Sequence, residues 1–375
     1  PSVINSKLSE SERQNSWLKI RSNQSKLIIG SRSAIFAPFS KLGMIIIDEE
    51  HESSYKQDTA PRYYTHDIAE KIQELNPNIK LIFASATPSI ETAEKLHDST
   101  LRLTKRIGSS TLPKVEIVDL RDEFKKQNYS IFSDVLKEEI KNALERKEQI
   151  ILFLNRRGDS SSVVCRDCGY ICKCENCDSP MTYHTKTLYE KKLICHHCGI
   201  LSKPPSLCPN CQGVNIRFLG VGTQKIESEL LKEFPEARVL RADKDTTATK
   251  HGFKEIYTKF KNHEADILIG TQMIAKGLHL PKVNLVGVVL ADIGLNIPDY
   301  KTSERNFQLL TQVAGRAGRN SNQGKVVIQT YNPDNISLIC AQDHDYEKFF
   351  TYERTQRKIL NNPPFGQIAK IIVQN

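Results

Sequence analysis

The sequence predicts an α/β protein that has two lobes, each built on a parallel β-sheet, and a zinc-binding module inserted into the second lobe. In both halves of the chain, short apolar runs rich in β-branched residues alternate with helical stretches, as expected of strands joined by crossover helices. Four Cys-x-x-Cys pairs interrupt this pattern in the second half. The length of 375 residues exceeds what one hydrophobic core usually covers, which supports more than one unit.

The first lobe is expected over residues 1–105. Its apolar runs at 26–30, 44–47 and 81–84 are bounded by glycine or polar residues, and we predict that they form buried parallel strands. Residues 65–75 are predicted to form a helix between two of these strands. Strands and helices that alternate in this way give a layered α/β unit.

The second lobe is expected to begin over residues 128–160 and to resume over 217–335, after the cysteine-rich module. Ser133 is a suitable N-cap for a helix, and a strand is predicted over 149–154. Residues 106–127 contain glycine, serine and proline without a clear period, which predicts a connector between the lobes.

The composition limits the partners and the compartment of the protein. The 53 Lys and Arg residues outnumber the 44 Asp and Glu residues and give a formal net charge of +9, which favours a polyanionic partner such as nucleic acid. No apolar run approaches the roughly 18 residues of a membrane span, and the chain does not begin with a secretion signal. We therefore expect a cytoplasmic protein without a membrane partner.

The cysteine-rich module, predicted over residues 161–216, is expected to bind two structural zinc ions. Each Cys-x-x-Cys pair can present two thiolates to one zinc ion. Four sulfur ligands close a site and leave no position for water, so each zinc should stabilise the module and not catalyse a reaction. Three pairings of the four pairs are possible, and the spacing does not choose among them. The predicted ligands are Cys165, Cys168, Cys174, Cys177, Cys195, Cys198, Cys208 and Cys211.

Basic and aromatic side chains of this module could contact single-stranded DNA through charge and stacking. A solvated basic loop is an equally good interpretation of the same residues. They are Lys173, Lys186, Lys191, Lys192, Tyr170, Tyr183 and Tyr189.

Residues 45–51 place carboxylates at the end of a predicted buried strand, where open α/β sheets bind ligands. Asp48 could hold Mg²⁺, usually through water, and Glu49 could orient or deprotonate the water that attacks the γ-phosphate of a nucleotide. An acidic helix start is the alternative. The hydroxyl-bearing residues 85–88, which end the next predicted strand, favour the nucleotide site.

Residues 312–319 read Gln-Val-Ala-Gly-Arg-Ala-Gly-Arg and set Arg316 and Arg319 three positions apart, on one face of a predicted helix. Guanidinium groups at that spacing can reach the oxygens of a transferred phosphoryl group. Both residues are therefore predicted to be arginine fingers, and Gln312 is predicted to contact the nucleotide. A basic surface turn is the alternative.

Residues 270–277 read Gly-Thr-Gln-Met-Ile-Ala-Lys-Gly and follow a predicted strand. Thr271 and Lys276 of this segment could meet the phosphates of a bound nucleic-acid strand. A simple strand-to-helix turn is the alternative.

In this order, and with a cysteine-rich module between strands of the second lobe, the motifs resemble the primosomal replication-restart helicases of superfamily 2. The resemblance implies two RecA-like lobes that bind ATP and Mg²⁺. It also implies a 3′-to-5′ DNA helicase that recognises stalled forks and helps to reload the replicative helicase. The implied partners are forked or single-stranded DNA, primosome proteins and single-strand-binding proteins. The segments that carry the resemblance are residues 30–38, 48–51, 85–88, 155–158, 270–277 and 312–319.

The resemblance also assigns roles to particular residues. It implies that the first and last Cys-x-x-Cys pairs share one zinc ion and that the two middle pairs share the other. It implies an aromatic-rich loop that couples DNA binding to ATP hydrolysis, in which Tyr55, Lys56 and Arg62 match the family pattern. His66 stands where that pattern has arginine, so the polar contact of that arginine is not assured here.

The chain contains no Gly-x-x-x-x-Gly-Lys-Ser/Thr phosphate loop. The resemblance places this loop upstream, so we expect an incomplete first lobe and no ATP hydrolysis by this chain alone. Residues 336–375 are predicted to be a helical linker and the start of a truncated C-terminal domain. Two hypotheses follow: the middle portion of an active helicase, or a truncated protein that binds DNA and partners through zinc without hydrolysing ATP. The intact segments 48–51 and 312–319 favour the first.

Overall fold

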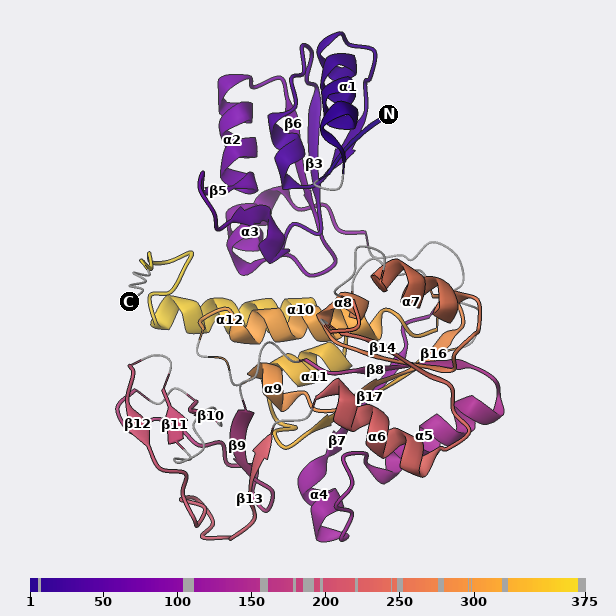
Figure 1. Cartoon of the computed structure of the whole chain (residues 1–375). Helices are drawn as coiled ribbons and strands as arrows, with labels where there is room; N and C mark the ends of the chain where they lie inside the picture. Colours follow the sequence, from indigo (N-terminus) through magenta and orange to yellow (C-terminus); the bar gives the residue numbers. More distant parts are fainter. Residues whose placement is uncertain are drawn as a thin grey trace. The chain divides into compact units, whose positions relative to one another are not determined.

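The chain divides into two compact units, Pro1–Thr100 and Leu101–Asn375 (Figure 1). Among the residues described, no helix is both long and apolar enough to cross a membrane. The computed structural model describes residues 1–5, 8–103, 111–155, 161–177, 180–184, 192–195, 198–219, 222–243, 245–247, 252–275, 280–295, 297, 299–318 and 323–369.

The first unit contains short parallel strand pairs flanked by helices. Strand β3 (Met44–Asp48) pairs in parallel with β6 (Lys80–Ala84), and β1 (Ser2–Ile4) pairs in parallel with β2 (Ile28–Gly30). Strands β2, β3 and β6 overlap the three predicted apolar runs. The other elements are α1 (Glu10–Arg21), α2 (Thr65–Leu75), α3 (Ile90–Lys95), the antiparallel strands β4 (Lys56–Gln57) and β5 (Tyr63–Tyr64), and the 3-10 turns η1 (Arg32–Phe36), η2 (Ser53–Tyr55) and η3 (His97–Ser99).

The strands of the first unit are less buried than predicted. Ile47 of β3 is buried, whereas Ile46 of the same strand is 60% exposed and Ile82 of β6 is 42% exposed. Successive side chains of a strand point to opposite faces of the sheet, so one face of this pair is packed and the other is at the surface. The prediction of buried strands is therefore wrong for one face of this pair.

The second unit is built on a six-stranded sheet in the order β14-β15-β8-β16-β17-β7, in which all neighbouring strands are parallel. Parallel strands need crossover connections, and helices accordingly lie on both faces of the sheet (Figure 1). The strands are β7 (Lys114–Asp119), β8 (Gln149–Phe153), β14 (Val239–Ala242), β15 (Ile267–Gly270), β16 (Val283–Val288) and β17 (Lys325–Thr330). The helices are α4 (Leu120–Lys125), α5 (Asp134–Glu145), α6 (Thr223–Glu233), α7 (Gly252–Lys261), α8 (Gln272–Ala275), α9 (Asp292–Leu295), α10 (Thr302–Ala314), α11 (Ile336–Gln342) and α12 (Tyr346–Ile359).

Part of the segment predicted to be a connector belongs to this sheet. Strand β7 pairs with β17 along its whole length, and α4 follows it directly. The prediction of a connector over 106–127 is therefore wrong for residues 114–125. Because β7 is an edge strand with several half-exposed side chains, its sequence lacks the continuous apolar run of a central strand.

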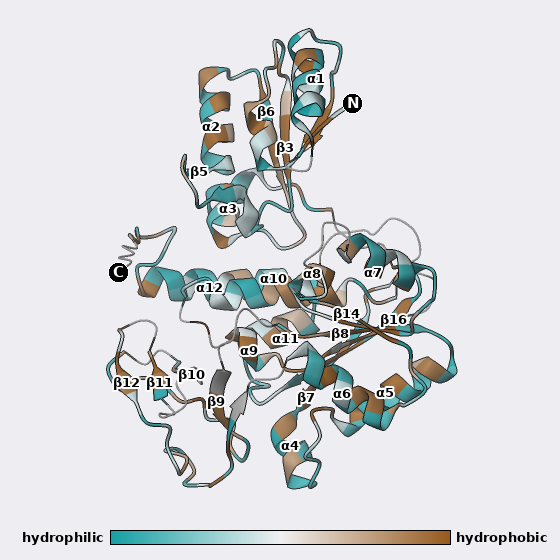
Figure 2. Cartoon of the chain, viewed as in Figure 1, coloured by the Kyte–Doolittle hydropathy of each residue, from teal (hydrophilic) through white to brown (hydrophobic). Residues whose placement is uncertain are grey.

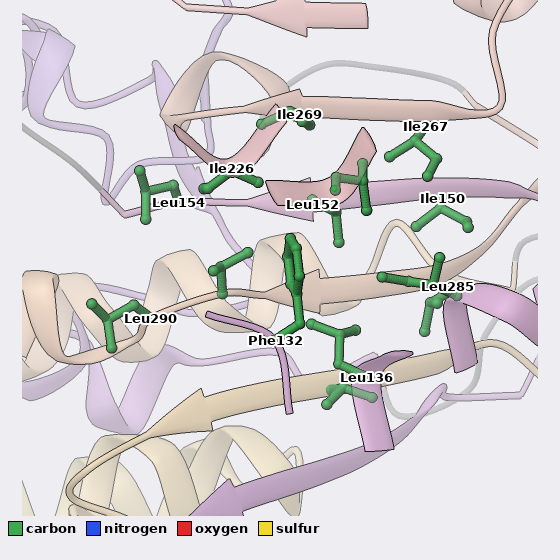
Figure 3. Packing of buried hydrophobic residues seen from close by; sticks show 14 of the residues in the cluster. Phe132, Leu136, Ile150, Leu152, Leu154, Ile226, Ile267, Ile269, Leu285 and Leu290 are labelled. Carbon is green, nitrogen blue, oxygen red and sulfur yellow. The ribbon is translucent and has the colours of Figure 1, made fainter. Parts of the chain in front are cut away.

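The main core lies between the sheet and helices α5 and α6. Ser133 caps α5 as predicted, since its Oγ accepts a hydrogen bond from the N–H of Leu136 at 3.2 Å. Leu136 then packs with Leu152 and Leu285 of the neighbouring strands (Figure 3). Figure 2 shows brown and teal residues alternating along α5, the pattern of a helix that buries one side.

The cysteine-rich module forms a five-stranded antiparallel sheet in the order β12-β11-β10-β9-β13. Val164 of β9 belongs to the main core of the second unit. The module is therefore packed onto the lobe into which it is inserted. Its strands are β9 (Ser161–Cys165), β10 (Thr182–His184), β11 (Lys192–Ile194), β12 (Leu201–Ser202) and β13 (Ile216–Leu219).

A buried ionic cluster joins α12 to α10. Arg357 is 1% exposed, and its guanidinium donates to Glu304 Oε2 at 2.6 Å and to Glu353 Oε1 at 3.0 Å. A third bond goes to the carbonyl oxygen of Pro363 at 3.2 Å. These contacts fix α12, which lies within the predicted linker 336–375, against the second lobe.

We expect Arg357→Ala to lower the free energy of unfolding of the second unit by about 3–5 kcal/mol, because it leaves two buried carboxylates without their cation. Urea unfolding followed by circular dichroism measures this change. Arg305→Ala is the matched control, since Arg305 pairs with Asp299 at the surface, where such pairs contribute about 0.2–1 kcal/mol. Equal losses in the two variants would contradict the prediction.

Candidate zinc centres and motor motifs

The cysteine-rich module brings its predicted ligands into two groups of four. One group joins the first and last Cys-x-x-Cys pairs, and the other joins the two middle pairs. Sulfur atoms from different pairs lie 3.6 and 3.7 Å apart in the first group and 3.4 Å apart in the second. This is the nested arrangement that the resemblance implies, and it selects one of the three pairings that the spacing left open.

Both groups fit a zinc ion. Four sulfurs at a Zn–S distance of about 2.3 Å in a tetrahedron lie about 3.8 Å from one another. All four sulfurs of each group lie within 4.8 Å of one another, which matches a small tetrahedral centre. Thiolate ligands favour zinc over the hard cations Mg²⁺ and Ca²⁺. The first group is Cys165, Cys168, Cys208 and Cys211, and the second is Cys174, Cys177, Cys195 and Cys198.

Tight backbone turns present the paired thiolates. At the first pair, the N–H of Gly169 donates to the carbonyl oxygen of Cys165 at 2.9 Å, and the N–H of Cys165 donates to the carbonyl oxygen of Tyr170 at 2.8 Å. The pairs that begin at Cys195 and Cys208 make the same two bonds. The residue after the second cysteine has a positive φ in all three turns, 76° at Gly169, which explains why glycine suits this place.

The first zinc group is held against the sheet of the second unit. Gly169 lies so close to the carbonyl oxygen of Tyr331 that an added Cβ would collide with it. The guanidinium of Arg166 lies over the ring of Phe124, 5.9 Å from its centroid. Zinc bound at this group would therefore stabilise the contact between the module and the lobe as well as the module itself.

The structure narrows the set of side chains that could contact DNA in the module. Tyr183 is 6% exposed and packs in the module's own core, so it cannot stack on a base. Lys173 is exposed, whereas Tyr170 and Lys192 are half-buried. The other candidates, Lys186, Lys191 and Tyr189, lie outside the described residues.

Asp48 ends strand β3 as predicted, and the side chains of Asp48 and Glu49 are both exposed. Glu49 adopts a φ of 47°, which turns the chain sharply after the strand. Its N–H donates to Asp48 Oδ1 at 3.0 Å. Two adjacent carboxylates at the carboxyl end of a parallel strand can hold a hydrated metal ion and a water molecule.

His51 connects this acidic segment to the hydroxyl-bearing segment 85–88. Its Nδ1 lies 2.7 Å from Ser85 Oγ, which also accepts the N–H of Thr87 at 3.0 Å. Both segments therefore share one hydrogen-bonded network at the ends of the paired strands β3 and β6. A shift of either segment would change the hydrogen bonds that join it to the other.

Glu50 is the residue of this segment whose role the sequence did not reveal. It is 1% exposed and accepts hydrogen bonds from the N–H of Ser89 at 2.6 Å, from Thr92 Oγ1 at 2.9 Å and from His66 Nε2 at 3.1 Å. Burial by itself would raise the pKa of Glu50, but these bonds outweigh it and hold the pKa below its ordinary value. Only its place after two other carboxylates hinted at such a role.

His66 thus makes a buried polar contact at the position where the family pattern has arginine. Its ring stacks between those of Tyr64 and Phe83, at centroid distances of 4.2 and 4.9 Å. Together with the bond to Glu50, this stacking ties the end of the aromatic-rich loop to the acidic segment.

The predicted aromatic-rich loop is also held at its start. Tyr55 Oη donates to the carbonyl oxygen of Asp48 at 2.6 Å, and burial, together with the carboxylates around it, raises the pKa of Tyr55. Arg32 Nη1 donates to the carbonyl oxygens of Ser54 and Lys56 at 2.8 and 3.0 Å. The side chains of Lys56 and Arg62 are exposed, as a DNA contact requires.

The structure changes the predicted geometry of the arginine segment. Helix α10 ends at Ala314, so Arg316 lies in the turn that follows and not on a helical face. Gln312 remains on the helix. The Nε of Arg316 donates to the carbonyl oxygen of Ala275 at 3.0 Å. Arg319 lies outside the described residues.

The segment 270–277 is described as far as Ala275. Thr271 follows strand β15, and α8 begins at the next residue. The predicted contact Lys276 lies outside the described residues.

Asp292, at the start of α9, is a buried carboxylate that the sequence did not single out. It accepts hydrogen bonds from the N–H of Tyr331 and from Thr330 Oγ1, each at 3.0 Å. Burial raises the pKa of Asp292 to about 6, although these bonds act in the opposite direction. Asp292 thereby anchors α9 to the end of β17.

Three family models match the chain. A DEAD/DEAH box helicase model matches residues 2–96, and a helicase conserved C-terminal domain matches residues 213–321. A model of the Cys-rich region of the PriA DNA helicase matches residues 174–200, which hold the second zinc group.

The chain is also similar over its whole length to proteins named replication restart protein PriA. The one from Bacillus subtilis is 46% identical over 376 residues, which cover 100% of this chain and 46% of that protein. Those from Synechocystis and Treponema pallidum are 43% and 40% identical, covering 98% and 100% of this chain and 45% and 56% of those proteins. The chain spans about half the length of the curated relatives it matches. The similarity to replication restart protein PriA therefore runs through both units and the zinc module of this chain.

Proposed function

We propose that this chain is the middle portion of an ATP-dependent 3′-to-5′ DNA helicase that acts in replication restart and primosome assembly at stalled forks. The observation that carries the proposal is that the carboxylates of Asp48 and Glu49 and the two four-cysteine groups occur in one chain. Paired carboxylates of this kind can bind Mg²⁺ and orient the attacking water in nucleotide hydrolysis. The second cysteine group lies within a segment that matches the Cys-rich region of the PriA DNA helicase.

In the proposed reaction, Asp48 holds Mg²⁺ through water and Glu49 orients the water that attacks the γ-phosphate. Gln312, Arg316 and Arg319 contact the nucleotide, and the guanidinium groups stabilise the charge of the transferred phosphoryl group. The two zinc ions are structural. DNA contacts are assigned to Tyr55, Lys56, Arg62, Thr271 and Lys276, and primosome and single-strand-binding proteins are the proposed protein partners.

The test is a strand-separation assay with a longer form of the protein that includes an in-frame phosphate loop. With ATP and Mg²⁺, we expect it to unwind a duplex with a 3′ single-stranded tail and to leave a matched 5′-tailed duplex paired. Glu49→Gln should bind the same DNA without unwinding it. Equal unwinding of both substrates, or unwinding by the Glu49 variant, would contradict the proposal.

For the 375-residue chain alone, we expect no measurable DNA-stimulated ATPase activity. Without a phosphate loop, the β- and γ-phosphates lack the backbone amides and the lysine that normally bind them. Phosphate release in the presence of oligodeoxythymidylate measures this. Robust turnover would show that hydrolysis does not depend on the missing motif, whereas DNA binding without turnover in every longer form would favour a non-hydrolysing zinc-dependent binding protein.

A further inference from the structure

A row of side-chain amides connects three segments of the second unit that are far apart in the sequence. Gln272 Nε2, at the start of α8, donates to Asn155 Oδ1 at 3.2 Å. Asn155 Nδ2 in turn donates to Asn306 Oδ1 at 2.8 Å. Asn155 follows strand β8 and is 7% exposed, and Asn306 lies on α10 and is 3% exposed.

The row ends on the backbone of α9. Asn306 Nδ2 donates to the carbonyl oxygen of Gly294 at 2.7 Å and to that of Thr302 at 3.0 Å. A Cβ at Gly294 would collide with the amides of both Asn155 and Asn306, so glycine is needed for this close approach. Since Asp292 anchors α9 to the sheet, the row is held at this end by the core.

A second contact joins the same two helices. The bond from Arg316 Nε to the carbonyl oxygen of Ala275 connects the end of α8 to the turn after α10. Helix α8 is thus linked to α10 at both of its ends, through Gln272 at one and Ala275 at the other. A displacement of α8 therefore moves the hydrogen-bonding partner of Asn155, which is bonded to Asn306, and that of Arg316.

We propose that Asn155 and Asn306 are positioning residues that transmit DNA occupancy at residues 271–275 to α10 and so to Gln312 and Arg316. This inference rests on the proposed function, which assigns a DNA contact to Thr271. Buried amide groups suit the task because each bond has a fixed direction and a lost partner is costly, so a shift at one end is passed on. Neither residue touches nucleotide or DNA in this scheme.

The test is hydrogen–deuterium exchange of the 375-residue chain with and without saturating oligodeoxythymidylate. We expect DNA to protect residues 271–275 and to slow exchange across 303–316 by at least about fivefold, the lower end of common coupling between sites. In the double variant Asn155→Leu/Asn306→Leu, the protection of 271–275 should remain and the response of 303–316 should be lost. Replacing both partners by apolar side chains of similar shape keeps the fold more readily than replacing one.

Two further variants make the result decisive. Asn155→Ser removes only the middle of the row and should also lose the response, so the test does not depend on the double variant folding. Asn284→Leu is the control. It removes a comparable amide bond, to Glu148 at 2.7 Å, near the start of strands β8 and β16, whereas Asn155 follows the end of β8, and it should respond as the unaltered chain does.

The outcomes separate the two proposals. DNA protection of 271–275 without slower exchange at 303–316, or an unchanged response in the Asn155 and Asn306 variants, would overturn the inference and leave the proposed function standing. If the amides had a purely structural role, the response of residues 303–316 to DNA would be unchanged in these variants. Absence of any DNA-dependent protection would overturn the DNA contact of the proposed function and the inference with it.

Discussion

Arg316→Ala is expected to lower the rate of ATP hydrolysis by about 10³-fold or more, the effect usual for loss of an arginine finger. The measurement is steady-state phosphate release by a form of the protein that includes a phosphate loop. The guanidinium stabilises charge that develops on the transferred phosphoryl group, so its loss should affect turnover and spare DNA affinity. The bond from Arg316 to the carbonyl oxygen of Ala275 shows that this side chain is already held in place.

Arg305→Ala is the control for this experiment. Arg305 lies on the same helix, α10, and makes an ion pair at the surface with Asp299 at 2.6 Å. Its loss should leave turnover within a factor of about two, because exposed pairs contribute little. If Arg316→Ala hydrolysed ATP at the unaltered rate, the segment 312–319 would be the basic surface turn that its sequence also allows.

Zinc should be bound at two ions per chain, and Cys208→Ser should reduce this to one. Structural zinc contributes an apparent binding free energy of about 10–16 kcal/mol in small zinc-binding folds, so loss of one ligand should unfold the half of the module around the first group. Metal analysis of the purified chain gives the stoichiometry, and limited proteolysis within 198–219 reports the unfolding. The second group, Cys174, Cys177, Cys195 and Cys198, should keep its ion.

Cys340→Ala is the matched control, because Cys340 is buried in the second unit but belongs to neither group. This variant should retain two zinc ions. One ion or none in the unaltered chain would contradict the two-site prediction, and two ions in the Cys208 variant would contradict the assignment of that ligand.

Local patterns predicted much of the fold. The helix over residues 65–75 and the N-cap at Ser133 were found from spacing and residue type, because a helix face and a cap depend on neighbours within one turn. The edge strand β7 was missed because four of its six side chains are not buried, so its sequence resembles a connector. Arg316 was placed on a helix because the pattern does not show that α10 ends two residues earlier.

The sequence by itself determined the chemistry available to this protein. The two cysteines of each Cys-x-x-Cys pair lie within one turn of backbone, and the carboxylates 48–49 directly follow one apolar run, so both patterns can be found from neighbouring residues alone. Only the tertiary structure decided which cysteine pairs share an ion, that Glu50 is buried against His66, and that Asn155 meets Asn306 across 151 positions of sequence. Such contacts depend on how distant segments cross in the folded chain, and no local pattern records that crossing.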